Sequence, residues 1–375
     1  MKGSKIKIAF VKFGGLAAGG TEKYLQTLAA NLPKDRFEVD YYYTDGVPLL
    51  GNNWIHPDTD PAREKYMNEH DINLIHVKCE SRQDTYGPPY PWVNDNFFAL
   101  FDSAKYDIVQ TGRSGYAEYP FIKMNDSVFV DSIHSGGDAG IEKRSNILKT
   151  VLLSEGHATR WINNGGDPSK AKVIPTLVEF PAPKASTLRK ELEIPANKFL
   201  YGMHQRNDEE IFSSIPLEAY SLIESEKNMF VMLGGAQKYR QQAASLGLKN
   251  VRFLDFSGDV ERINNFVSGL DVFAHGRHDG EVCSAAIIEA LHYGKPVVSC
   301  PGINMGHAEQ IAGCGIMTTS ITEYAMALQR LATDDIFYQK KTSQSIDRYK
   351  TRYSLDVAIH KYIQIYENIY DRNLQ

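Results

Sequence analysis

Short β-rich apolar runs alternate with helical patterns along this chain, and the alternation is what most constrains its fold. Residues 5–11 (KIKIAFV) and 228–234 (NMFVMLG) are examples of these runs. A long series of such strands with helical segments between them is typical of parallel sheets whose connections are crossover helices. The sequence therefore predicts an α/β protein built from parallel sheets.

The expected strands fall into two series, which indicates two doubly wound, Rossmann-like domains facing a cleft. The linker is expected between the two series, at residues 179–198. Pro181, Pro183 and Pro195 interrupt both helix and strand there. The first series comprises residues 5–11, 37–44, 73–78, 106–111, 127–134, 150–155 and 172–177, and the second comprises 198–204, 228–234, 251–256, 270–276 and 295–302.

The expected domains are residues 1–182 and 183–354, with a C-terminal helix over 355–375 that completes the first. Apolar residues from Val357 to Ile369 recur in this segment at helical spacing, so the helix must dock on a core, and we expect that core to be the first domain's. A chain of 375 residues is long enough for two such domains.

Composition narrows the function classes. The chain is 42% hydrophobic and 23% charged with a net charge of −5, which is typical of a soluble globular protein and gives no reason to expect a nucleic-acid partner. Its four cysteines show neither zinc spacing nor a Cys-x-x-Cys pair, so we expect no metal, no disulfide framework and a reducing compartment. The N-terminal apolar stretch is too short for a signal sequence or a membrane span, and a cytoplasmic location is expected.

A glycine-rich turn, FGGLAAGGTEK (residues 13–23), follows the first strand. Gly14 and Gly19 have the spacing of a phosphate-binding P-loop, but Gly20 stands where that motif needs its Lys. The glycines do not fit the dinucleotide fingerprint either. A flexible turn without a ligand is the simplest interpretation of the loop taken alone.

Residues 278–299 (HDGEVCSAAIIEALHYGKPVVS) carry the most information. Ser284 is a good N-cap and Gly294 a good C-terminal stop, which places the preceding loop at a helix N-terminus, a site suited to a diphosphate. Glu289 lies about 7.5 Å along that helix from its start. Its neighbours are apolar, so its carboxylate needs hydrogen-bond donors from the protein or from a ligand such as a ribose, unless Glu281 and Glu289 are both merely solvated.

Glu281 and Glu289, spaced eight apart and followed by Ala and GKPVV, resemble the signature of the retaining family 4 glycosyltransferases, whose fold is GT-B. GGTEKYLQTLAANL resembles the N-terminal loop and first helix of that family, KVIPTLVEF its interdomain segment and YENIY its terminal helix, so the resemblance covers most of the chain. It implies a metal-independent enzyme without cofactor, in which the second domain binds a nucleotide-diphospho-sugar and the first holds a glycan, lipid-linked or other acceptor.

The resemblance also implies roles for individual residues. Glu289 would hold the ribose hydroxyls, Glu281 would contact the donor sugar, and Val282, Cys283 and Ser284 would lie near the diphosphate. Gly14 and Gly15 would line the site opposite the diphosphate. His134, at the end of an expected strand, would contact and orient the transferred sugar, although a lone His there is equally well structural.

One departure concerns the diphosphate. The family has an Arg and, five or six residues later, a Lys that stabilise the leaving group; Arg206 fills the first place, but Glu210, Ile211 and Phe212 stand where the Lys is expected. This leaves open a substitute cation, a different way of holding the donor, or weak activity. Two other function classes therefore stay open: a non-catalytic sugar-nucleotide binder, and a GT-B epimerase using His134 and Glu281 as acid and base.

Two further patterns have simpler explanations. Asp58 and Asp60 form an Asp-x-Asp, but N-capping by Asp60 with Pro61 in the first helical turn explains it better than a metal. The aromatic segment 86–101 could stack on an acceptor sugar or contact a membrane surface at a lipid headgroup, while packing is the favoured interpretation. The nucleotide base, the sugar, the linkage and the oligomeric state are not encoded in any recognisable pattern.

Overall fold

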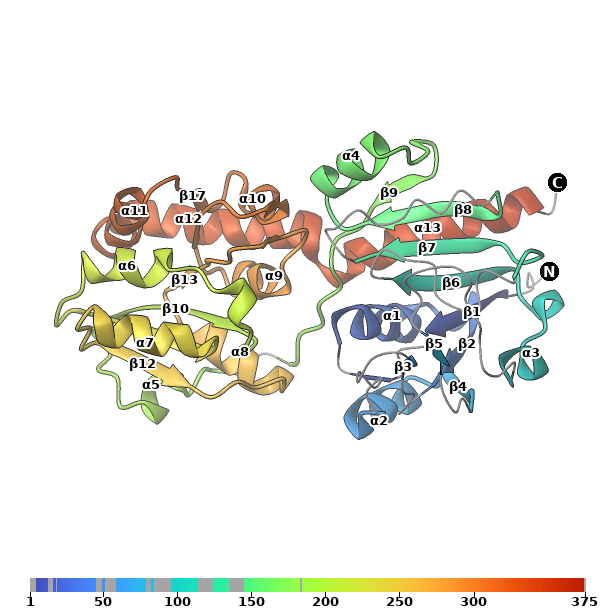
Figure 1. Cartoon of the computed structure of the whole chain (residues 1–375), viewed down its shortest axis with the longest axis horizontal. Coiled ribbons are helices and arrows are strands. Elements are labelled where there is room, and N and C mark those ends of the chain that lie inside the picture. Colours follow the sequence, from blue (N-terminus) through green and yellow to red (C-terminus); the bar gives the residue numbers. More distant parts are fainter. Residues whose placement is uncertain are drawn as a thin grey trace. The chain divides into compact units, whose positions relative to one another are not determined.

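The structure is a computed structural model that describes residues 5–12, 16–17, 19–44, 49–50, 59–78, 82–83, 96–113, 124–134, 145–182 and 184–373. The chain divides into two compact units (Figure 1). Unit 1 comprises residues 1–177 and 358–375, and unit 2 comprises residues 178–357. The expected boundaries, 182 and 355, lie a few residues from these.

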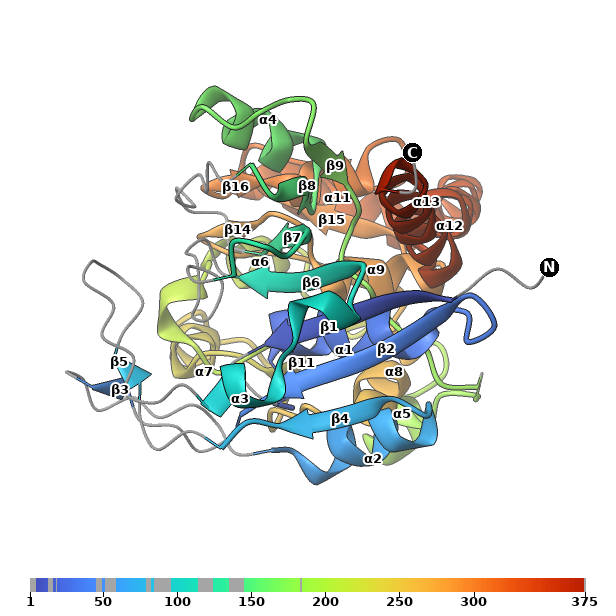
Figure 2. The same cartoon turned by 90° about the vertical axis from the view of Figure 1, so that its right-hand side faces the viewer.

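Unit 1 is a parallel sheet of seven strands in the order β4-β2-β1-β6-β7-β8-β9, which Figure 2 follows from β4 at the bottom to β9 at the top. The chain runs outward from β1 in both directions, so the strand order reverses between β1 and β6. The strands are β1 (Ile6–Lys12), β2 (Phe37–Tyr43), β4 (Asn73–His76), β6 (Ile108–Arg113), β7 (Phe129–Ile133), β8 (Ile147–Leu152) and β9 (Ala171–Val173), with a separate short pair of β3 (Leu49–Leu50) and β5 (Arg82–Gln83).

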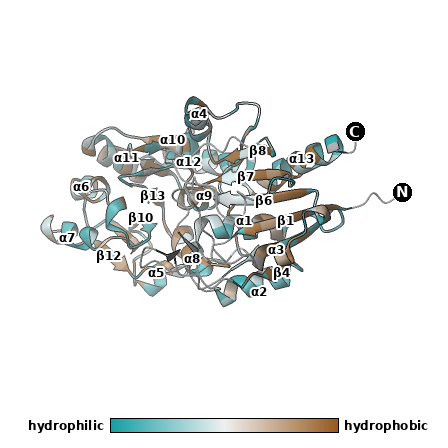
Figure 3. Ribbon diagram, turned by 45° about the vertical axis from the view of Figure 1, so that its right-hand side comes forward, coloured by the Kyte–Doolittle hydropathy of each residue, from teal (hydrophilic) through white to brown (hydrophobic). Residues whose placement is uncertain are grey.

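Helices cover this sheet, whose strand β1 is largely hydrophobic (Figure 3). The helices are α1 (Gly20–Asn31), α2 (Pro61–Glu69), α3 (Asn96–Leu100), α4 (Glu155–Asn163) and α13 (Leu355–Asn373), with a 3₁₀ turn at Ser103–Lys105. The C-terminal helix α13 packs on unit 1 through buried tyrosines: the Tyr366 hydroxyl donates to Gln110 Oε1 at 2.7 Å, and the hydroxyls of Tyr362 and Tyr24 are 2.9 Å apart.

Unit 2 has a second parallel sheet, in the order β12-β11-β10-β13-β15-β17. Its order reverses between β10 and β13, and in open α/β sheets ligands bind outside the carboxyl ends of the strands at this switch point. The strands are β10 (Phe199–Gln205), β11 (Asn228–Gly234), β12 (Val251–Leu254), β13 (Val272–Ala274), β15 (Val297–Ser299) and β17 (Ile316–Met317), with a separate pair of β14 (Gly280–Glu281) and β16 (Asn304–Met305).

The helices of unit 2 connect these strands. They are α5 (Leu188–Glu191), α6 (Ile215–Ser221), α7 (Gln237–Ser245), α8 (Val260–Gly269), α9 (Ala285–His292), α10 (Gly306–Ile311), α11 (Ile321–Thr333) and α12 (Asp335–Arg348), with a 3₁₀ turn at Glu209–Ile211 and a π-helical turn at Tyr349–Tyr353. The α/β class with parallel sheets, predicted from the sequence, is confirmed.

Several element boundaries differ from the expectation. β8 begins at Ile147 and ends before Ser154, whose hydroxyl caps α4 by accepting from the His157 amide, so residues 153–155 are not strand. β9 ends at Val173, because Pro175 has no amide to donate to a ladder. The short strands β14, β16 and β17 were not expected, and the linker contains the short helix α5.

The capping prediction is confirmed, and the packing prediction can be followed for part of its segment. The Asp60 side chain accepts from the Ala62 amide at 2.9 Å and so caps α2, with Pro61 as the first helical residue, whereas Asp58 lies outside the described residues. In the aromatic segment 86–101, Phe97 and Phe101 are buried against Tyr42, as packing requires. Residues 86–95 of that segment lie outside the described part of the chain.

Candidate donor site in unit 2

The helix α9 organises the candidate site. Ser284 caps it, with its hydroxyl accepting from the Ile287 amide, and Gly294 follows its end with a φ of +65°, as the sequence predicted. Five of the predicted site residues lie near it: Glu281 to Ser284 come just before the helix, and Glu289 is its fifth residue. The helix begins beyond β13, so these residues belong to the switch-point side of the sheet in unit 2.

Glu289 has a protein partner. Its Oε2 lies 2.6 Å from Nε2 of His204, a residue near the end of β10, and the two side chains are 12% and 15% exposed. A carboxylate only accepts hydrogen bonds, so Nε2 of His204 carries the proton. The bond fixes one oxygen of Glu289, while Oε1 has no partner among the described residues and can accept from a ligand hydroxyl.

Glu281 is held on both oxygens. Its Oε2 is 3.0 Å from Nε2 of His275, and its Oε1 is 3.2 Å from Nη1 of Arg277. Burial alone would raise the pKa of this carboxyl, but the His275 hydrogen bond and the Arg277 charge lower it to about 2. Glu281 is therefore an oriented anion throughout the neutral pH range.

His275 is itself held by a hydrogen bond to Ser299. Its Nδ1 lies 2.7 Å from the hydroxyl of Ser299, and both residues are buried. The chain Ser299–His275–Glu281 thus fixes the orientation of the imidazole that supports Glu281.

The segment that carries Glu281 is a strand instead of the expected loop. β14 pairs in parallel with β16, Gly280 opposite Asn304. Gly280 has a φ of +60°, and a Cβ there would lie 1.9 Å from the Asn304 carbonyl oxygen, so only glycine fits. A Cβ on Gly306 would likewise lie 1.9 Å from the Val282 carbonyl oxygen. Close backbone packing therefore sets the position of Glu281.

Ser284 and Cys283 are less accessible to a bound diphosphate than expected. The Ser284 amide donates to Oε1 of Gln310 at 2.7 Å, and Nε2 of Gln310 donates back to the Ser284 carbonyl at 2.9 Å. The amide and hydroxyl of Ser284 are thus used inside the protein. The Cys283 side chain is buried, and Val282 is partly exposed. A diphosphate at this helix start would meet the amides that follow Ser284.

Arg206 follows the end of β10 with its side chain 62% exposed. Its Nη2 lies 2.7 Å from Oδ2 of Asp208. The Asp208 carboxylate also accepts from the Glu210 amide, and this bond, followed by the Arg206 charge, lowers its pKa. The loop has no Lys at 210–212, where Glu210, Ile211 and Phe212 stand, and Lys238 from the start of α7 approaches Glu209 at 3.6 Å.

His134 lies in unit 1, just beyond β7. Its Nε2 is 3.0 Å from the Ser132 hydroxyl, and its ring meets Tyr24 edge to face with 4.5 Å between centroids. Burial, aided by the charge of Lys12, lowers its pKa to about 3, so the imidazole is neutral at physiological pH. Gly14 and Gly15 lie outside the described residues.

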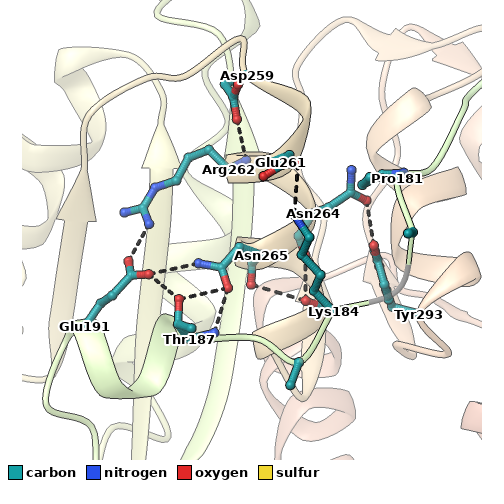
Figure 4. A pocket seen from close by; sticks show the side chains of 13 residues that line it. Pro181, Lys184, Thr187, Glu191, Asp259, Glu261, Arg262, Asn264, Asn265 and Tyr293 are labelled. Carbon is teal, nitrogen blue, oxygen red and sulfur yellow. Dashed lines mark hydrogen bonds and ion pairs between the residues drawn. The ribbon is translucent and has the colours of Figure 1, made fainter.

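A separate pocket of about 380 Å³ lies between residues 181–191 and α8 in unit 2 (Figure 4). None of the predicted site residues lines it. Its polar side chains bond to one another: Arg262 pairs with Glu191, the Thr187 amide donates to Asn265 Oδ1 at 2.7 Å, and Tyr293 donates to Asn264 at 2.8 Å. The bonds of Arg262 and Asn265 thus hold the linker against α8.

Sequence reasoning missed His204, His275 and Arg277. Each stands at the carboxyl end of an expected strand, where ligand-binding residues of such sheets gather, and that position was the available signal. Among the described residues, no three His, Cys, Asp or Glu side chains gather in a group that could hold a metal ion. In the same part of the chain, no helix is long and apolar enough to cross a membrane.

Comparison with known proteins agrees with this architecture. Residues 213–334 match the model of the family described as glycosyl transferases group 1, a segment that includes both Glu281 and Glu289. No curated protein matches the chain.

Solved structures match nearly the whole chain at low identity. HepE from Anabaena, in complex with UDP and glucose, is 20% identical with a TM-score of 0.71, covering 96% of this chain and 99% of that one. A glycosyltransferase from Rickettsia africae is 17% identical (TM-score 0.75; 97% and 98% covered), and sucrose-phosphate synthase from Thermosynechococcus elongatus is 16% identical (0.70; 98% and 100%). The chain therefore has the GT-B fold, and its residues 213–334 match the glycosyl transferases of group 1.

Proposed function

We propose that this protein is a retaining, metal-independent glycosyltransferase that moves a sugar from a nucleotide-diphospho-sugar to a glycan, lipid-linked or other acceptor. The observation that carries the proposal is the pair Glu281 and Glu289 on either side of the α9 start, at the switch point of the unit 2 sheet. Both glutamates fall within the segment that matches the group 1 family.

In this proposal unit 2 binds the donor. Oε1 of Glu289 accepts from the ribose hydroxyls while His204 holds Oε2. Glu281, ionised and fixed on both oxygens, accepts from hydroxyls of the donor sugar. Arg206 stabilises the diphosphate as it leaves, and the amides at the start of α9 add a partial positive charge. UDP-glucose is the first donor to try, because HepE is in complex with UDP and glucose.

The reaction we propose is a front-face displacement. The departing diphosphate assists removal of the acceptor proton, so that no protein nucleophile is needed, and the protein supplies charge stabilisation and orientation. His134, neutral at physiological pH, would contact the transferred sugar by a hydrogen bond and not as a cation. Nothing in this scheme requires a metal or a cofactor.

The pKa values of the two candidate residues argue against the epimerase. An epimerase needs an acid and a base at the sugar, but the lowered pKa values of Glu281 and His134, about 2 and about 3, leave both deprotonated at neutral pH. The non-catalytic binder has one observation in its favour, the absence of a Lys at 210–212. A measurement of turnover distinguishes the non-catalytic binder from the glycosyltransferase.

The test is to incubate the protein with nucleotide sugars, UDP-glucose first, and a panel of glycoside acceptors, with and without EDTA. We expect nucleotide release and a product whose anomeric proton coupling in NMR matches that of the donor, undiminished by EDTA. An inverted product would contradict the retaining mechanism, and loss of activity with EDTA would contradict metal independence. Donor binding without release of nucleotide would support the binder.

A further inference from the structure

The loop after β10 has no Lys at 210–212, where the family resemblance implies a second cation for the diphosphate, but the neighbouring strand β13 is followed by Arg277. β10 and β13 are adjacent, with Gly202 opposite Phe273. Arg206 and Arg277 each lie four residues beyond this pair (202 + 4 and 273 + 4). The two arginines therefore follow the carboxyl ends of the two strands that form the switch point.

Hydrogen bonds join the two loops on both sides of Arg277. Nε2 of Gln205 donates to the Gly276 carbonyl at 2.6 Å, and the His278 amide donates to the Ile211 carbonyl at 3.2 Å. Ile211 is within the stretch where the Lys is missing. Arg277 is thus held, by its own two neighbours in sequence, against the segment that lacks a cation.

The guanidinium of Arg277 donates hydrogen bonds to two carboxylates. Its Nε and Nη2 donate to the two carboxylate oxygens of Asp279 at 2.9 and 2.7 Å, and Nη1 donates to Glu281 at 3.2 Å. A phosphate group presents the same pair of acceptors to a guanidinium. The Asp279 side chain is 38% exposed against 16% for Arg277, so the carboxylate can turn toward solvent while the guanidinium stays in place.

Charge explains why such an exchange would accompany binding. Arg206, Arg277, Asp208, Asp279 and Glu281 together carry a net charge of −1, which repels a diphosphate. Moving Asp279 away frees two donors of Arg277 and lowers the negative charge beside the ligand. The third donor still holds Glu281, the residue that faces the sugar.

We propose that Arg277 is the second diphosphate-binding cation of this protein, and that Asp279 occupies its guanidinium until the donor's diphosphate replaces it. The proposal rests on the donor site proposed above and adds to it a residue that sequence spacing does not reveal. Arg277 would then join diphosphate and sugar recognition, because the same guanidinium contacts both the phosphate and Glu281.

The test is calorimetric binding of UDP, GDP and ADP, each compared with its monophosphate, to the wild type and to Arg277→Gln, Arg277→Lys and Asp279→Asn. Arg277→Gln should weaken the diphosphate roughly 10- to 100-fold and reduce its advantage over the monophosphate, because charged hydrogen bonds are lost. The diphosphate affinity of Arg277→Lys should lie between those of the wild type and Arg277→Gln. Asp279→Asn should bind the diphosphate as tightly as the wild type or more tightly.

The matched control is Arg189→Gln. Arg189 pairs with Asp271 at 2.6 Å just before β13 begins, at the opposite end of the same strand. The Arg189→Gln substitution should lower the melting temperature without changing the ratio of diphosphate to monophosphate affinity. If Arg277→Gln does not fold, Arg277→Lys and Asp279→Asn still decide the question.

Two results would overturn the proposal while leaving the donor site intact: an unchanged ratio in Arg277→Gln or Arg277→Lys, or a loss in Asp279→Asn as large as in the Arg277 variants. The latter would mean that the Arg277–Asp279 pair is purely structural. If no nucleoside diphosphate binds the wild type, the donor site and this inference fall together.

Discussion

Individual residues at the candidate site are held by partners that leave specific atoms for a ligand. His204 engages one oxygen of Glu289, while His275 and Arg277 engage Glu281 from two sides. Preorganised acceptors of this kind cost little reorganisation when a ligand arrives. Ser284, by contrast, donates its amide to Gln310, and its hydroxyl caps α9.

The bond between His204 and Glu289 leads to a prediction about ribose recognition. His204→Phe should weaken UDP binding about tenfold, because the carboxylate loses the charged hydrogen bond that orients it. It should also narrow the preference for UDP over 2′-deoxy-UDP, measured by calorimetry. His204→Gln, which retains a donor, should lose less. Equal affinity of wild type and His204→Phe for both ligands would refute this role.

The buried histidines of unit 1 predict a pH dependence of stability. The pKa of His134 is lowered to about 3 and that of His157 to about 4, mainly by burial. Below pH 6.5 the unfolded chain binds protons that the folded chain does not, so stability falls as the pH drops from 6.5 toward these values. Urea titrations at pH 7.5 and 5.0 measure the loss.

His134→Gln should lose less stability than the wild type between these two pH values, because one of the mismatched groups is gone. His360→Gln, at an exposed position of α13, is the control and should behave as the wild type does. A loss in His134→Gln as large as that of the wild type would show that His134 does not contribute.

At the scale of elements, the sequence indicated the long strands and the N-caps but not the short pieces that shape the site. Ser284, Asp60 and Gly294 could be assigned because caps and stops depend on local chemistry. The two-residue strands β14 and β16 have no periodicity to detect. They exist because Gly280, Gly302 and Gly306 let backbones approach closely, a tertiary effect that no local pattern reveals.

The β14–β16 pair yields a prediction about Gly280. Gly280→Ala should destabilise unit 2 by more than about 1 kcal/mol, because the positive φ is strained and the new Cβ meets the Asn304 carbonyl. It should also weaken donor binding by displacing Glu281. Gly247→Ala has a similar φ of +68° but nothing within 4 Å, and so isolates the cost of the φ alone. Denaturant titration compares them, and equal losses would contradict the packing argument.

Helix α13 yields a second prediction at this scale. Tyr366→Phe should destabilise unit 1 by about 1–2 kcal/mol, because the buried Gln110 loses the hydroxyl that donates to its Oε1. Gln364→Ala, on the exposed face of the same helix, should change stability by less than about 0.5 kcal/mol. A Tyr366→Phe variant as stable as the wild type would show that α13 docks without this bond.

For the whole molecule, the alternation of strands and helices was enough to predict two parallel-sheet units, and solved structures of GT-B fold match nearly all of the chain. Glu289 could be singled out from its apolar surroundings, and Glu281 from its spacing to Glu289. His204, His275 and Arg277 could not, because their importance depends on which strands lie side by side. Strand order, with its reversal between β10 and β13, is a property of the folded sheet.

Binding of a nucleoside diphosphate to unit 2 through Glu289 underlies the proposed function, and a thermal-shift panel measures it. UDP, GDP, ADP, CMP and their sugar conjugates would be added to the wild type and to Glu289→Ala, because a ligand that binds only the folded state raises the melting temperature. We expect one nucleoside diphosphate to raise the melting temperature of the wild type and to have little effect on that of Glu289→Ala. No shift with any nucleotide, or an equal shift in both proteins, would contradict it.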